Sequence, residues 1–248
     1  MENEKFVIWG RNPVVEAIKS GRSLEKILIA HDSHIPKQII KLAEEKKIKI
    51  QKVPRKKVEE LAGTKKTQGI VALVSPISYW DATKLMQKTI EEKGFLVFLD
   101  HITDPQNVGN IIRTAEVLGA SGVVVPRERS APINEVVVKG SAGAVFHLPI
   151  AKVSSLRDSL EKFQKLGGWI LAIEKGGKPI HKLKFPFPLA LVLGSEGKGT
   201  SKSILKLADI IATIPMKGKI TSLNVASAGA IGMWEVSKQN WIEVGNNE

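Results

Sequence analysis

The chain has 248 residues, of which 43% are hydrophobic, and this suits one large domain or two small ones with a buried core. It holds no cysteine, which excludes disulfides and thiolate metal sites, and no apolar run approaches the roughly 20 residues that a membrane-spanning helix needs. The formal net charge of +12 at pH 7 favours a polyanionic partner such as nucleic acid, and a solvated lysine-rich surface explains it equally well.

Residues 1–76 are predicted to form a small α/β domain. Their first ten positions are too polar for a signal peptide, so we expect a cytoplasmic protein without a membrane partner. Lys65 and Lys66 lie in this basic region and are candidate RNA contacts. The apolar spacing predicts helices and strands in alternation, at residues 12–19, 26–30, 36–46, 48–53, 54–61 and 70–74.

Residues 77–93 are predicted to be a linker that contains a charged helix at 81–93, and residues 94–248 a second α/β domain. Arg127 and Arg129 lie in a loop of this domain at 126–132, and Lys175–Pro188 is rich in turn residues. The other expected elements are a strand at 95–99, a helix from Val108, a strand ending at Val125, a strand at 145–150, a helix at 153–166 and a strand at 169–173.

Three blocks place polar residues directly after an apolar run: Asp104–Ala115, Leu189–Gly199 and Ile214–Ala228. The carboxyl ends of strands in an open α/β sheet meet at one edge, so we expect the blocks to converge on a small polar ligand. The third block leads into a helix of small residues, which predicts close packing on most sides, with Ser222 as its N-cap and Asn224 in its first turn.

Several common sites are absent from the sequence. The glycines at 194–199 have the wrong spacing for a P-loop, and neither a dinucleotide-binding G-x-G-x-x-G nor a hydrolase G-x-S-x-G is found. His31 and His34 have no nearby partner ligand, so we expect no metal.

The three blocks resemble the signature motifs of the SpoU-type RNA ribose 2′-O-methyltransferases, members of the trefoil-knotted SPOUT superfamily. The residues that carry this resemblance are Asn107, Gly109, Asn110 and Arg113, then Gly194, Glu196 and Gly197, then Pro215, Met216, Ser222, Leu223 and Asn224. The resemblance implies a mostly parallel, trefoil-knotted C-terminal sheet, a small N-terminal α/β domain like the L30e ribosomal proteins, and a homodimer with its active site near the interface.

The resemblance also implies S-adenosylmethionine as the cofactor. The residues it assigns to the cofactor are Leu193, Gly194, Glu196, Gly197, Ile214, Met216, Ser222 and Leu223; those it assigns to catalysis are Asn107, Arg113, Glu196, Ser222 and Asn224. The guanidinium of Arg113 keeps its proton in proteins, so we expect it to hold a phosphate and stabilise a developing alkoxide. Turn formation alone would explain the glycines, and helix capping alone would explain Ser222. Arg127 and Arg129 are candidate contacts for RNA phosphate.

The predicted function is S-adenosylmethionine-dependent 2′-O-methylation of RNA, with a guanosine of large-subunit (23S) ribosomal RNA preferred and no role for DNA. A transfer-RNA enzyme and a resistance methyltransferase acting on ribosomal RNA are alternatives within the family. A base methyltransferase and a noncatalytic RNA-binding assembly factor are the alternatives from other classes. Thr67 and Phe146 differ from the residues that are common at these positions in the ribosomal branch of the family. Both lie outside the three motifs, so the differences concern the identity of the RNA target and not the reaction.

Overall fold

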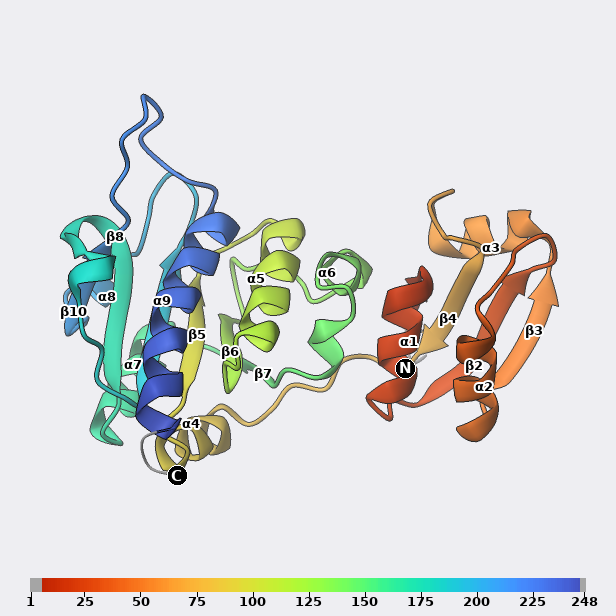
Figure 1. Ribbon diagram of the computed structural model, residues 1–248, viewed down its shortest axis with the longest axis horizontal. Coiled ribbons are helices and arrows are strands. Elements are labelled where there is room, and N and C mark those ends of the chain that lie inside the picture. Colours follow the sequence, from red (N-terminus) through yellow and green to blue (C-terminus); the bar gives the residue numbers. More distant parts are fainter. Residues whose placement is uncertain (1–5, 246–248) are drawn as a thin grey trace. The chain divides into compact units, whose positions relative to one another are not determined.

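The computed structural model describes residues 6–245 (Figure 1), and the chain within it divides into two compact units. One unit contains the residues up to Ser78 together with Pro132–His147, and the other contains Tyr79–Ala131 and the residues from Leu148 onward. Nothing in the sequence pattern predicted that residues 132–147 group with the N-terminal unit. No helix among the described residues is both long and apolar enough to cross a membrane.

The first unit is built on a four-stranded sheet with the order β1-β4-β2-β3, in which β4 runs antiparallel to β1 and β2. All five residues of the central strand β4 are buried, as its unbroken apolar sequence predicts. The elements are β1 (Phe6–Trp9), α1 (Arg11–Lys19), β2 (Leu24–Ala30), α2 (Lys37–Glu45), β3 (Lys49–Val53), α3 (Arg55–Ala62) and β4 (Ile70–Val74).

The segment at 132–147 adds α6 (Glu135–Gly140) and the short 3-10 helix η1 (Ala144–Phe146) to this unit. His147 Nε2 lies 2.9 Å from Glu16 Oε2, and the Arg22 guanidinium lies over the Phe146 ring, 5.5 Å from its centroid. The strand predicted at 145–150 is therefore wrong. Gly143, with φ +95°, starts a 3-10 turn, and the apolar side chains after it pack as a turn of helix.

The second unit has a six-stranded sheet with the order β10-β8-β9-β5-β6-β7, and all five neighbouring pairs are parallel. The mostly parallel α/β sheet predicted from the sequence is confirmed. The strands are β5 (Phe95–Asp100), β6 (Gly122–Pro126), β7 (Ile150–Val153), β8 (Trp169–Pro179), β9 (Leu189–Gly194) and β10 (Ile210–Thr213).

Helices cover both faces of this sheet (Figure 1). A core formed by α4 (Ala82–Glu91), α7 (Leu156–Lys165) and α8 (Lys202–Leu205) covers one face, with Phe98 and Phe163 among its largest buried side chains. On the other face, α5 (Pro105–Val117) packs beside α9 (Val225–Gly245). A Cβ on Gly232 would lie 2.1 Å from Ile173 Cδ1, so the small residues of α9 do bring it close to the sheet. The outward face of α9 is nevertheless exposed, unlike the prediction.

Candidate active site

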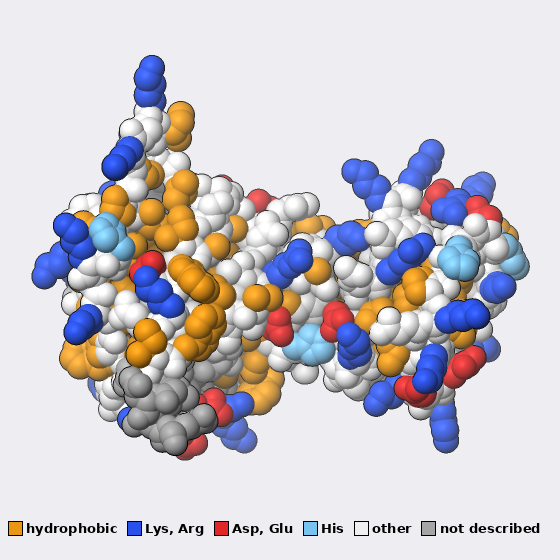
Figure 2. All heavy atoms as spheres, viewed as in Figure 1, with side chains coloured by type: hydrophobic (Ala, Val, Ile, Leu, Met, Phe, Trp, Pro, Cys, Tyr) orange, Lys and Arg blue, Asp and Glu red, His pale blue; other side chains and the backbone are white. Residues whose placement is uncertain are grey.

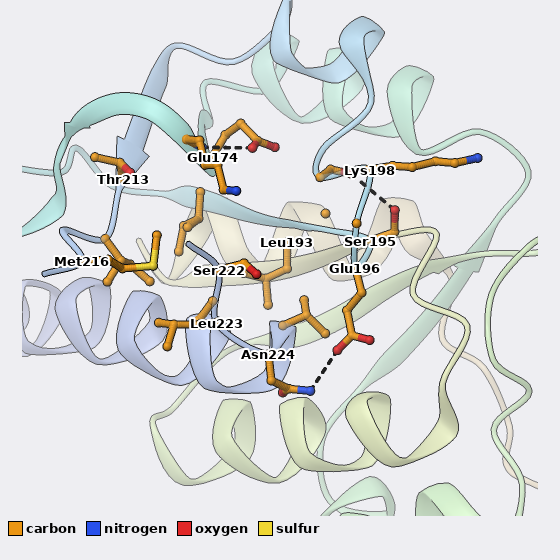
Figure 3. A pocket seen from close by; sticks show the side chains of 18 residues that line it. Glu174, Leu193, Ser195, Glu196, Lys198, Thr213, Met216, Ser222, Leu223 and Asn224 are labelled. Atoms are coloured by element: carbon orange, nitrogen blue, oxygen red, sulfur yellow. Dashed lines mark hydrogen bonds between the residues drawn. The ribbon is translucent and has the colours of Figure 1, made fainter. Parts of the chain in front are cut away.

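Asn107, Glu196 and Asn224, one from each of the three blocks, form a single hydrogen-bonded cluster. Glu196 Oε1 accepts hydrogen bonds from Asn107 Nδ2 at 2.9 Å and from Asn224 Nδ2 at 2.8 Å, and Asn107 Oδ1 accepts from Asn224 Nδ2 at 2.9 Å. Figure 3 shows the contact between Glu196 and Asn224. The expected convergence of the blocks at the carboxyl edge of the parallel sheet is therefore present in the structure.

Helix caps place two members of this cluster. Asp104 Oδ1 accepts from Gln106 N at 2.9 Å, so α5 begins at Pro105, three residues before the predicted Val108, and Asn107 lies buried in its first turn. Asn224 Oδ1 accepts from Ala226 N at 2.9 Å and caps α9.

Since Asn224 is the N-cap of α9, the prediction of that role for Ser222 is wrong. Ser222 lies two residues earlier, exposed in the loop that Figure 1 shows leading from β10 to α9. Ser222 instead lines the cavity described below.

A tight hairpin, residues 194–200, carries Glu196. Ser195 and Gly199 exchange backbone hydrogen bonds of 3.1 and 2.9 Å, and Gly197 at its tip has φ +83°. A Cβ on Gly194 would lie 2.2 Å from both Gly199 C and Thr200 N. The glycines therefore let two backbone segments approach each other more closely than any side chain would allow.

The second and third blocks, Ile173–Lys175 in the middle of β8 and Thr213 of β10 surround a cavity of about 660 Å³, a size typical of sites for small ligands. The first block does not line it, and its Asn107 reaches the cavity wall only through hydrogen bonds to Glu196 and Asn224. All eight residues expected to bind the cofactor line it, as Figure 3 shows for several of them. Leu193, Met216 and Leu223 supply apolar surface suited to an adenine ring, and the backbone of the hairpin supplies polar groups for a ribose. The residues present thus fit an adenosyl group.

Glu174 and Thr213 also line the cavity, and sequence reasoning missed both. Glu174 Oε2 accepts from Thr200 N at 2.8 Å, and its Oε1 accepts from Lys175 N at 2.9 Å, so this carboxylate holds the hairpin in place. Glycines at 176–177 suggested turns, but β8 continues to Pro179 and carries Glu174 past the hairpin. A carboxylate close to two consecutive glycines at the end of an apolar run was the available signal.

Replacing Glu174 by Gln is expected to weaken S-adenosylmethionine binding about tenfold. The amide NH₂ would have to face a backbone N–H where the carboxylate now accepts a charge-assisted hydrogen bond, worth about 1.5–3 kcal/mol. Calorimetric titration of the cofactor measures this effect, with Glu91→Gln, an exposed site in the last turn of α4, as the control. Equal affinity of the two variants would mean that the hairpin keeps its shape without Glu174.

The remaining predicted residues lie outside the cavity. Arg113 is exposed on α5 and forms no hydrogen bond or ion pair with residues 6–245. Arg127 and Arg129 line two other hollows at the carboxyl edge of the same sheet. Lys65 and Lys66 are exposed in the first unit.

Residues 94–234 match the SpoU rRNA Methylase family, and residues 7–80 match a family described as RNA 2′-O ribose methyltransferase substrate binding. The chain belongs to the SpoU methylase family. Its membership confirms the predicted α/β fold class and the predicted enzyme class. The SpoU chain is an RNA methyltransferase, and its cofactor is S-adenosylmethionine.

Bacterial relatives extend the match over nearly the whole SpoU chain. A Bacillus subtilis strain 168 protein, named as a member of the TrmH family of tRNA/rRNA methyltransferases, is 37% identical over 245 residues, which are 96% of this chain and 98% of that protein. A Staphylococcus saprophyticus protein with the same family name is 37% identical over 247 residues, with coverage of 96% and 98%.

Solved structures agree with this assignment. The SpoU methyltransferase AviRb from Streptomyces viridochromogenes, in complex with AdoMet, has a TM-score of 0.79 and 26% identity over 95% of this chain and 90% of that chain. An AdoMet-bound rRNA methyltransferase from Sinorhizobium meliloti has a TM-score of 0.79 and 25% identity over 96% and 88%.

Proposed function

We propose that this SpoU methyltransferase transfers a methyl group from S-adenosylmethionine to the ribose 2′-oxygen of a guanosine in large-subunit ribosomal RNA. The hydrogen-bonded cluster of Asn107, Glu196 and Asn224 is the observation that carries this proposal, because Glu196 and Asn224 line the cofactor cavity and Asn107 bonds to both. A transfer-RNA substrate and a resistance modification of ribosomal RNA are the alternatives. The trefoil knot implied by the motifs remains a prediction.

Coverage of the solved relatives favours ribosomal RNA. The Sinorhizobium rRNA methyltransferase covers 96% of the chain, including the N-terminal unit. The Aquifex aeolicus TrmH/SpoU tRNA-modifying enzyme covers 66%, and a structure titled for 2′-OH methylation of C/U34 on tRNA covers 59%. These two tRNA enzymes thus leave a third or more of this chain unmatched, whereas the Sinorhizobium rRNA enzyme matches nearly all of it.

The cofactor supplies an electrophilic methyl group when bound, so the protein has to align the acceptor oxygen and receive its proton. Asn107 and Asn224 both donate to Glu196 Oε1, which fixes the orientation of the carboxylate. Oε2 of Glu196 forms no hydrogen bond within the described part of the chain. We infer that this second oxygen orients the ribose hydroxyl, with Glu196 or solvent as the final proton acceptor.

We further propose a homodimer in which each Arg113 serves the partner's cavity. The outward surface of α5 and α9 exposes apolar side chains that an isolated subunit would leave in water, and Figure 2 shows apolar side chains gathered over α9. They are Val117, Ile231, Trp234, Trp241 and Ile242. Arg113 lies one helical turn from Val117 on α5, so a second copy covering this surface would receive its guanidinium.

Nucleoside analysis tests the reaction. The protein is incubated with isotope-labelled S-adenosylmethionine and either protein-free 23S ribosomal RNA or tRNA transcripts, and the digested nucleosides are identified by mass spectrometry. We expect labelled 2′-O-methylguanosine from ribosomal RNA. Label on a base would contradict the ribose assignment, label in tRNA alone would select the tRNA alternative, and no label in either would favour the noncatalytic binding factor.

Reversing the charge of Lys65 and Lys66 together should weaken binding of ribosomal RNA by about tenfold and leave cofactor affinity unchanged. Both side chains are exposed in the first unit, so they contribute to RNA affinity through phosphate attraction alone. Filter binding at fixed salt measures the effect, with Lys165→Glu/Lys206→Glu in the second unit as the matched control. Equal loss in both double variants would indicate a nonspecific effect of net charge.

A further inference from the structure

A second large hollow, of about 880 Å³, lies at the edge strand β7 of the catalytic sheet. Its walls come from the chain around the start of α4, from the start of α7, and from Arg127 after β6. We call this hollow the edge groove. None of the residues that line the edge groove lines the cofactor cavity.

Two aromatic side chains are presented in the edge groove. Trp80 N donates to Ile150 O at 2.8 Å, and Trp80 forms a parallel bridge with Ala151, so the sheet edge holds its backbone rigidly. Its side chain is still 48% exposed, and that of the adjacent Tyr79 is 40% exposed. Rings held on a rigid element but left open to solvent are suited to stacking against a flat partner.

Cations accompany both rings. Lys152 Nζ lies 5.1 Å from the centroid of Tyr79, and Lys88 Nζ lies 5.9 Å from the centroid of Trp80. Arg127 adds a further cation to the wall of the groove. An aromatic ring beside a positive charge is suited to a nucleotide, because the ring can stack on the base while the cation attracts the neighbouring phosphate.

Other charges of the edge groove are compatible with an anionic partner. Its two carboxylates, Asp81 and Asp158, lie at the N-termini of α4 and α7, where the partial positive charge of each helix offsets them. Lys162 Nζ donates a hydrogen bond to Thr83 Oγ1 at 2.6 Å, and this bond links α7 to the start of α4. Burial raises the pKa of the Tyr79 phenol, so this side chain stays neutral and does not repel a phosphate.

The edge groove and the cofactor cavity open along the same edge of the sheet. Arg127 directly follows β6 and Ser154 follows β7, whereas the cavity lies where β9 and β10 end, beside Ile173–Lys175 of β8. From β9 to β7 the sheet crosses three strand intervals, which is about 14 Å at the usual spacing of ~4.8 Å. One RNA strand could therefore reach both places.

We propose that the edge groove binds a single-stranded RNA segment next to the methylated nucleotide, with bases stacked on Trp80 and Tyr79 and phosphates held by Arg127 and Lys152. This inference rests on the proposed function and adds a surface that selects unpaired substrate. The sequence placed these residues in a linker and loops and did not predict the groove.

Trp80→Ala tests the stacking contact, and Trp169→Ala is its matched control. Trp169 is 44% exposed but lies at the amino end of β8, paired with Leu189 at the start of β9. The probes are a fluorescein-labelled single-stranded uridine 12-mer and protein-free 23S ribosomal RNA. We expect Trp80→Ala to bind both RNAs roughly tenfold more weakly, as for loss of one stacked base, and Trp80→Phe and Trp169→Ala to bind like the parent, with cofactor affinity equal in all variants.

Lys152→Gln tests the phosphate contact through salt dependence. Its plot of log affinity against log salt concentration for the 12-mer should be shallower by about 0.7, the value for one phosphate contact on a single strand. Lys165→Gln, exposed near the end of α7, should leave the slope unchanged. Equal affinity of the Trp80 and Trp169 alanine variants, or an unchanged slope in Lys152→Gln, would overturn the proposal.

These binding measurements need no methyl transfer. Loss of binding in Trp80→Ala with no labelled ribose from the parent enzyme would refute the proposed reaction and keep the groove. Methylated ribose with no effect of Trp80→Ala would keep the reaction and refute the groove.

Discussion

Replacement of Arg113 by alanine should lower the rate of methyl transfer at saturating substrates at least about 100-fold, the scale for loss of one group that stabilises developing charge. Cofactor affinity should change less than about twofold, because Arg113 lies outside the cofactor cavity of its own subunit and is expected to act on the acceptor side of the partner's. Single-turnover methylation and calorimetry measure the two quantities, and Glu116→Ala, exposed on the same helix, is the control. Equal loss of turnover and cofactor affinity would place Arg113 in the cofactor site or the fold.

Mixed dimers test whether Arg113 acts on the partner's cavity. Arg113→Ala and Glu196→Ala chains are each expected to be inactive. If Arg113 crosses the interface, one site of each mixed dimer has both groups intact, so random exchange restores roughly a quarter of the wild-type activity. If Arg113 serves its own cavity, every site in the mixture lacks one group and no activity returns.

Gly194→Ala should abolish detectable cofactor binding, a loss of at least about 100-fold. The new Cβ would meet backbone atoms of Gly199 and Thr200 at 2.2 Å, and neither can move without opening the hairpin that carries Glu196. Gly218→Ala is the control, because a Cβ there meets no atom within 4 Å in the loop before α9.

Calorimetry reports cofactor binding by both glycine variants, and thermal unfolding shows whether each remains folded. A Gly194→Ala protein that binds the cofactor like the parent would show that the close approach of residues 194 and 199 is unnecessary.

The catalytic unit was predictable because its signals are local and its sheet is parallel. Unbroken apolar runs identified β5 and β9, and the rule that ligands bind at the carboxyl ends of such strands predicted that the blocks of Asn107, Glu196 and Asn224 converge. All eight expected cofactor residues line one cavity for the same reason. Their roles in binding and catalysis remain predictions.

The failures share one physical cause, which is competition between local and tertiary signals. Glycines at 176–177 resembled a turn, yet pairing with β10 keeps the chain extended to Pro179 and positions Glu174. Ser222 and Asn224 are both good helix caps, and hydrogen bonds to distant residues favour Asn224. Residues 132–147 pack on a unit that ends more than 50 residues earlier, a pairing that no periodicity encodes.

The placement of residues 132–147 has a consequence for biosynthesis. The chain passes between its two units three times, after Ser78, Ala131 and His147. A nascent polypeptide that has emerged only as far as β4 lacks α6 and η1, which carry the buried Val137, Val138 and Phe146 and pack on β1 and α1 of the same unit. The first unit is therefore complete only after about a third of the second unit has been translated, so the two units are made as one interdependent product.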